Sequence, residues 1–284
     1  MNVKSLYKYY YHQLYDAIKY LDREAINRSS ESAIRLLNKN IDQLSAFISL
    51  LTYVDETIPL IRCQGALGKF KKDFIDLYLS YLEENLVKSN PVLFDENKQI
   101  DQILSREESL SRDRYSKSVH ELYLNTIHAT EKVVIDHINQ MNEDKLGVKT
   151  HEYFRNLVEV YLEHLQEGDF DSLDLILAEI YYNLLLFRET KPIESGEYQD
   201  EELDHLLDTL HQLKEMLVAR KLYHDTARKL QFYGAQDEEM DKDLLNKMRQ
   251  IENGLIRGGG YLESFGDKLL SYLSQLLWIE SGSV

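Results

Sequence analysis

The sequence predicts an all-α protein. Proline occurs only three times in 284 residues and glycine only twelve times, so long helices can form without the residues that break them. Apolar side chains recur at steps of three and four residues, the spacing of one helix face. No segment alternates apolar and polar residues between turn residues, as a half-buried strand would. We therefore expect eight or nine helices, packed as antiparallel bundles or as an elongated array of αα-hairpins.

The first two helices are predicted from clear apolar stripes. Residues 3–24 place Leu6, Tyr10, Leu14, Ile18 and Leu21 on one face. Six tyrosines within residues 7–20 combine a large apolar ring with a polar tip, and we expect most of them to pack in the core. A second helix follows Ser30, whose hydroxyl suits an N-cap. Its apolar stripe runs over residues 33–51.

The next part of the first half contains one undecided segment. A third helix is expected from near Thr57, with Pro59 tolerated in its first turn. Residues 89–94 are predicted to form a loop because the residue before Pro91 is pushed out of helical geometry. Helical periodicity then returns from residue 100 to about 145. Within it, residues 105–118 are polar and of mixed charge, and the pattern does not decide between a solvated helix, a bend and a loop.

The second half is expected to begin near residues 145–148, which separate a predicted N-terminal helical bundle, 1–146, from an acidic C-terminal bundle, 147–284. Thr150 is predicted to cap a helix that ends at Gly168 in a left-handed C-cap. Asp171 is predicted to cap the next helix, so that the two form an αα-hairpin.

Three more segments complete the chain. A helix over residues 203–232 is expected to end at Gly234, and another is expected from Asp237 to the glycines at 258–260. These glycines are predicted to form a flexible hinge. A last helix, 262–278, is apolar over much of its circumference, which favours burial in the core or in a subunit interface.

The charge distribution suggests the class of partner. The net charge is −16, and residues 150–215 contribute −13 of it, with 17 acidic and 4 basic side chains. Such a field repels phosphate backbones and attracts basic partners. We therefore expect no nucleic-acid binding and favour a non-enzymatic module that binds another protein, with a homo-oligomer as a further possibility. The expected partner-binding residues are acidic: Glu159, Glu163, Glu167, Asp169, Asp174, Glu201, Asp204 and Asp208.

The main alternative is a metal-dependent helical enzyme. Glu202, His205, Asp208 and His211 follow one another at three-residue steps, and Glu202-x-x-His205 has the form of a carboxylate-bridged metal motif. A second such motif is missing and leucines occupy the inward face, so we expect no metal and no cofactor. His120, His128, His137 and Glu131 form a weaker cluster. Cys63 lies beside Arg62, but a buried, inert thiol is the expected outcome.

The expected compartment follows from what the sequence lacks. A single cysteine excludes an internal disulfide and fits a reducing compartment, and no run of about 20 apolar residues is present to span a membrane. We expect a cytoplasmic protein, and the sequence does not decide whether it is a piece of a longer one. A second alternative is a cytosolic regulatory part of a membrane assembly that docks through the last helix.

Overall fold

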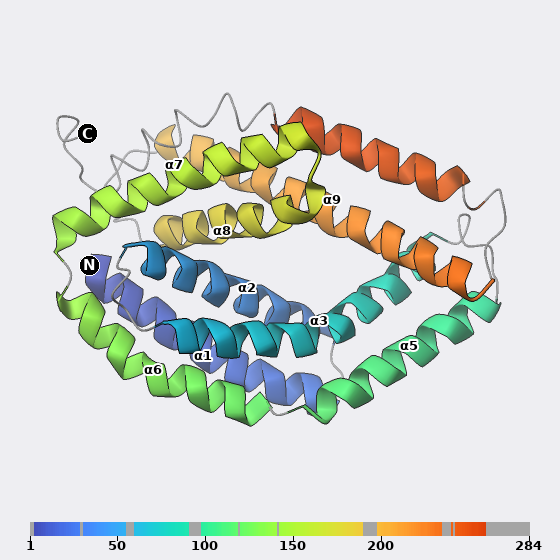
Figure 1. Ribbon diagram of the computed structural model, residues 1–284, viewed down its shortest axis with the longest axis horizontal. Coiled ribbons are helices and arrows are strands. Elements are labelled where there is room, and N and C mark those ends of the chain that lie inside the picture. The colour runs from blue at the N-terminus through green and yellow to red at the C-terminus, as the bar shows by residue number, and fades with distance from the viewer. Residues whose placement is uncertain are drawn as a thin grey trace.

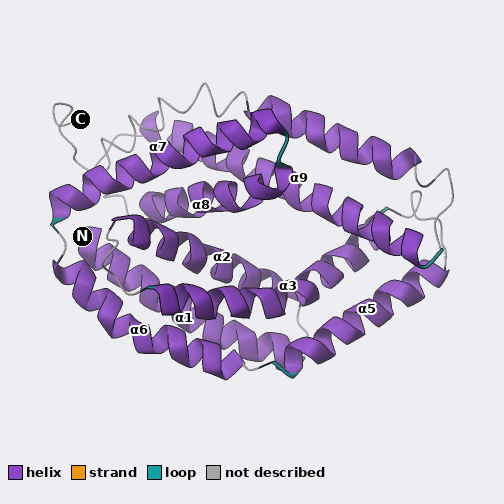
Figure 2. Ribbon diagram, in the orientation of Figure 1, coloured by secondary structure: helices purple, strands orange, loops and turns teal. Residues whose placement is uncertain are grey.

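The structure is a computed structural model that describes residues 3–28, 31–54, 60–90, 98–118, 120–140, 142–189, 198–234, 240 and 242–259. Within these ranges every regular element is an α-helix, as the purple ribbons of Figure 2 show. The predicted all-α class is therefore confirmed. The predicted start of the third helix at Thr57, the loop around Pro91 and the last helix, 262–278, fall wholly or partly outside the described residues.

In the first half, the described residues form five helices. The first helix is longer than its predicted range, since helical geometry extends to Arg28. The undecided polar segment is mainly helical, and the chain turns after residue 116 rather than in the middle of the segment. In order, the elements are α1 (Val3–Arg28), α2 (Glu31–Val54), α3 (Ile61–Ser89), α5 (Lys98–Ser116) and α6 (His120–Gln140).

The second half continues with α7 (Glu143–Glu167), α8 (Phe170–Glu189), α9 (Tyr198–Phe232) and a helical segment at residues 242–259. Gly168 has φ 73° and Gly234 has φ 66°, so both glycines end helices in the left-handed conformation, as predicted. The two N-caps predicted in this half are wrong, and the third predicted N-cap, Ser30, lies outside the described residues. Thr150 lies buried inside α7, which begins seven residues earlier, and Asp169 rather than Asp171 caps α8.

The helices pack around α2 and α8, which lie at the centre of the molecule (Figure 1). The helix α2 packs against α1 and α3 from its own half of the chain and against α7 and α8 from the other half. One apolar cluster continues through both halves and includes Phe47, Phe74, Phe154 and Leu210. The division at residue 146 falls inside α7, and the independent folding of 1–146 and 147–284 stays a prediction.

The glycines at the end of segment 242–259 are close-packed. A Cβ atom at Gly258 would lie 2.3 Å from Cδ2 of Leu213 on α9, and one at Gly259 would lie 1.8 Å from Cδ2 of Leu165 on α7. Both residues are helical. For these two positions the predicted flexible hinge is wrong: the missing side chains allow the helix backbone to approach α7 and α9 closely. Gly260 lies outside the described residues.

Two glycine-to-alanine variants should change stability in opposite directions. Gly258→Ala should lower the free energy of unfolding by about 1–3 kcal/mol, because the added methyl overpacks the contact with buried Leu213. Gly65→Ala should raise it by about 0.5–1 kcal/mol, because Gly65 lies inside α3 with no atom within 4 Å of its added Cβ and alanine loses less conformational entropy there. Urea denaturation followed by circular dichroism measures both. Equal effects at the two positions would contradict close packing at Gly258.

Candidate functional site

The predicted acidic surface includes a row of carboxylates on α7. Glu159, Glu163 and Glu167 follow one another at four-residue steps, which brings their side chains to one side of the helix. All three are exposed. Glu159 forms an ion pair with Arg155, with 3.5 Å between Oε1 and Nε. Glu163 and Glu167 form no ion pair with any described residue.

Two of the predicted residues serve the packing of α8. Asp169 accepts hydrogen bonds from the backbone N–H of Ser172 at 3.3 Å and from its hydroxyl at 2.6 Å, which is the geometry of an N-cap. It also lies 3.1 Å from Nδ1 of His164. Asp174 is half-buried, and burial raises the pKa of its carboxyl, while nearby Lys214 acts in the opposite direction. These two carboxylates are less available to a partner than those on α7.

The remaining predicted residues lie in the first turns of α9. Glu201 and Asp208 are exposed and form no ion pair with a described residue. Asp204 pairs with Arg188 of α8, with 2.7 Å between Oδ1 and Nη2. The structure therefore places five of the eight predicted residues on exposed faces of α7 and α9. Of the other three, Asp169 caps α8, Asp174 is half-buried and Asp204 forms an ion pair between helices.

The predicted metal ligands are not gathered around one point. His211 stacks on Tyr181 of α8 with 5.7 Å between ring centroids, whereas His205 lies one and a half turns earlier beside Thr209. The helix places these two histidines about 120° apart around its axis. The side chain of Glu202 is outside the described part. No group of three or more histidine, cysteine or acidic side chains in that part is arranged to hold a metal ion.

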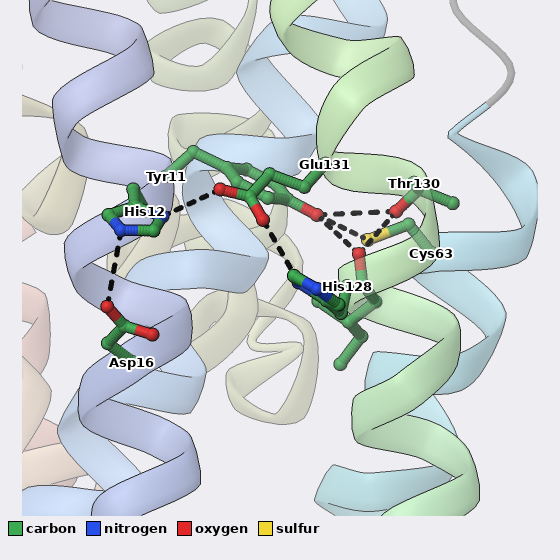
Figure 3. A network of polar contacts seen from close by, with 8 residues as sticks. Tyr11, His12, Asp16, Cys63, His128, Thr130 and Glu131 are labelled. Atoms are coloured by element: carbon green, nitrogen blue, oxygen red, sulfur yellow. Dashed lines mark hydrogen bonds and ion pairs between the residues drawn. The ribbon is translucent and has the colours of Figure 1, made fainter.

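A polar network that the sequence only partly predicted joins α1 to α6 (Figure 3). Oε1 of Glu131 lies 2.6 Å from Nδ1 of His12, and Oε2 lies 3.0 Å from Nδ1 of His128. His12 also contacts Asp16, at 3.3 Å. The hydrogen bond to Glu131 raises the pKa of His12. The sequence pattern placed His128 and Glu131 in one predicted cluster. It did not predict His12, which is 119 residues away from Glu131 and is connected to it by no local pattern.

The deeper part of the same network contains the single cysteine (Figure 3). The hydroxyl of Tyr11 donates to the carbonyl oxygen of Ile127 at 3.1 Å and lies 3.5 Å from Sγ of Cys63. Cys63 is fully buried, which confirms that part of the prediction. Burial also raises the pKa of its thiol. A protonated, enclosed thiol is a poor nucleophile, so Cys63 serves as a packing residue.

His120 belongs to a second, buried cluster rather than to the one predicted around Glu131. Its Nδ1 lies 2.9 Å from Oδ1 of Asp22, and the same oxygen accepts a hydrogen bond from the hydroxyl of Tyr115 at 2.5 Å. The three side chains come from α6, α1 and α5 and are almost completely buried. This cluster fixes the junction between α5 and α6 to the first helix.

The fold is one that has been solved before. The crystal structure of the CHAD domain from the plant Ricinus communis aligns with a TM-score of 0.58 and 10% sequence identity, over 99% of this chain and 93% of that chain. At such low identity the likeness establishes a shared helical fold. No family model and no curated protein matches the sequence. In the described part of the chain, no helix is both long enough and apolar enough to cross a membrane.

Proposed function

We propose that this chain is a non-enzymatic helical module that binds a basic protein through the exposed carboxylates of α7 and α9. The observation that supports the proposal most directly is a set of exposed carboxylates without ion pairs on these two helices. Glu163, Glu167, Glu201 and Asp208 are exposed and form no ion pair with any described residue. Exposed carboxylates that lack a cation of their own are available to the cations of a partner.

The first half pairs part of its acidic side chains internally, although Asp101 on α5 and Glu121 and Asp136 on α6 are also exposed without an ion pair to a described residue. In α3 and α5, three acidic side chains have basic partners one turn away: Glu84 with Lys88, Glu108 with Arg112 and Asp113 with Lys117. These pairs also occupy basic residues that would otherwise be available to attract a polyanion or the acidic surface of a second copy. The surplus of negative charge is concentrated in residues 150–215, which contribute −13 of the net −16. This concentration supports α7 and α9 as the binding surface.

The proposal predicts salt-sensitive capture by the α7 carboxylates. In the triple variant Glu159→Gln, Glu163→Gln and Glu167→Gln, basic proteins captured from the native cell extract by wild type should be lost. Their association rate with wild type should fall steeply as salt rises, since exposed charges steer encounter. Mass spectrometry identifies the captured proteins, and surface plasmon resonance with each purified partner measures the rate.

A matched control separates location from total charge. The control is a second triple variant that combines Glu84→Gln on α3, Asp113→Asn on α5 and Glu121→Gln on α6. It removes the same number of carboxylates elsewhere on the molecule. This control should retain the captured proteins and the fast association. If both triple variants lose binding equally, net charge rather than the α7 surface is responsible. If neither variant loses binding, the proposed surface is wrong.

A further inference from the structure

A cavity of about 280 Å³ lies between α2, α3, α8 and α9. The four helices meet near the middle of the molecule, where α8 packs between α2 and α9 (Figure 1). The cavity differs from the rest of this acidic chain in its charge. Arg35, Lys39 and Lys214 line it, against the single carboxylate of Glu215.

Lys214 is the most unusual residue of this cavity. The residue is only 8% exposed, yet its ammonium donates no hydrogen bond to a described residue. The ammonium lies 5.3 Å from the centroid of the Tyr182 ring, and its charge acts to lower the pKa of Asp174. By contrast, nearby Lys71 is paired with Asp42 at 2.7 Å. Because the ammonium has no hydrogen-bond acceptor among the described residues, it can donate to an anionic group in the cavity.

The walls of the cavity are aromatic. Tyr78, Tyr181 and Tyr182 face it from α3 and α8. The rings of Tyr181 and His211 stack at an interplanar angle of 26°, and His211 is exposed at the cavity. Flat aromatic surfaces bind planar groups through offset or edge contacts. The walls therefore suit a planar ring better than a flexible aliphatic chain.

One further polar atom is unused. The amide of Asn38 donates to Asp42 at 3.1 Å, but its buried Oδ1 has no hydrogen-bond partner in the described structure. Asn38 also lines the cavity. An unpartnered buried carbonyl oxygen accepts a hydrogen bond from a hydroxyl or amine. The cavity thus combines an ammonium, flat rings and one acceptor within a small volume.

We propose that this cavity binds a small aromatic anion, with its anionic group on Lys214, its ring against the tyrosines and a hydroxyl or amine donating to Asn38. The cations at the mouth, Arg35 and Lys39, attract the anion. The cavity is too small for an extended polyanion, and the carboxylates of Glu215, Asp42 and Asp174 nearby oppose a ligand of high negative charge. This site is separate from the acidic surface of α7 and α9 and does not depend on the function proposed for it.

Calorimetric titration with 4-hydroxybenzoate tests the site. The wild-type protein should bind it saturably at one site. Lys214→Met, which keeps the aliphatic stem but removes the charge, should weaken binding by about tenfold or more, because a hydrogen bond to a charged group is lost. Lys221→Met replaces an exposed lysine on the same helix and should bind like wild type. Thermal denaturation of each variant shows whether the fold is retained.

Two simpler probes separate the contributions of charge and ring. Phenol supplies the ring without the anion, and inorganic triphosphate supplies charge without a ring, so both should bind more weakly than 4-hydroxybenzoate. Equal binding of 4-hydroxybenzoate to wild type and to folded Lys214→Met would overturn the proposal. So would the absence of any binding, or tighter binding of triphosphate.

Discussion

Replacing Asp22 with alanine should lower the free energy of unfolding by about 3–5 kcal/mol, the cost expected when one partner of a buried polar cluster is removed. Asp22 is only 4% exposed and accepts hydrogen bonds from both Tyr115 and His120. Alanine would leave a buried hydroxyl and a buried imidazole without their acceptor. Water cannot replace the carboxylate without opening the contact between three helices.

The packing around this cluster explains why it cannot relax easily. The ring of His120 lies 4.0 Å from that of Tyr115 and 5.4 Å from that of Phe70, measured between centroids. A side chain held between aromatic rings has few alternative rotamers that would restore a hydrogen bond. We therefore expect Asp22→Ala to lower the free energy of unfolding and also to weaken the contact between α1 and the α5–α6 junction.

Urea denaturation at neutral pH measures this effect, and two control variants give it a scale. Tyr115→Phe removes one of the two donors and should lower stability by about 1–2 kcal/mol, since Asp22 keeps its bond to His120. Asp16→Ala removes an exposed carboxylate of the same helix and should change stability by less than about 0.5 kcal/mol. An Asp22→Ala effect no larger than that of Asp16→Ala would show that the cluster contributes nothing to stability.

The helices were predictable because they depend on local signals. Apolar residues three and four positions apart define a buried face, and positive-φ glycines such as Gly168 and Gly234 mark where a helix stops. The N-caps of α7 and α8 were less predictable. Thr150 has a side chain that suits an N-cap, but the residues before it are already helical, since α7 begins at Glu143. The tertiary packing of α7 overrides the local preference of one residue.

The candidate sites were harder to predict because their members meet only in the folded chain. Asp22 and His120 are 98 residues apart, and neither stands out in its own helix. Asp174 has the same charge and a similar local context to Glu163, yet Asp174 is half-buried and Glu163 is exposed. The glycines at 258 and 259 illustrate the same limit, since composition cannot distinguish a flexible joint from a close helix contact.

Replacing Lys229 with methionine should be almost as damaging as Asp22→Ala. Lys229 of α9 donates to Glu83 of α3, a carboxylate that is only 1% exposed. Without the lysine, a buried carboxylate loses its cation, which typically costs about 3–5 kcal/mol. Replacing both residues, as in Glu83→Leu with Lys229→Met, should cost less than Lys229→Met alone, because no buried charge is left unpaired.

The pH dependence of Lys229→Met distinguishes a lost charge pair from lost packing. Burial raises the pKa of Glu83, while Lys229 acts to lower it, so removing the lysine should raise this pKa further. A carboxyl with a raised pKa in the folded state holds its proton more tightly there than when unfolded. Stability then rises as pH falls from the folded pKa of Glu83 towards the unfolded value. The deficit of Lys229→Met at pH 8 should therefore shrink towards pH 5, while the deficit of the double variant, which lacks Glu83, should not shrink. A deficit of Lys229→Met that is the same at both pH values would assign the loss to packing and not to the charge of Glu83.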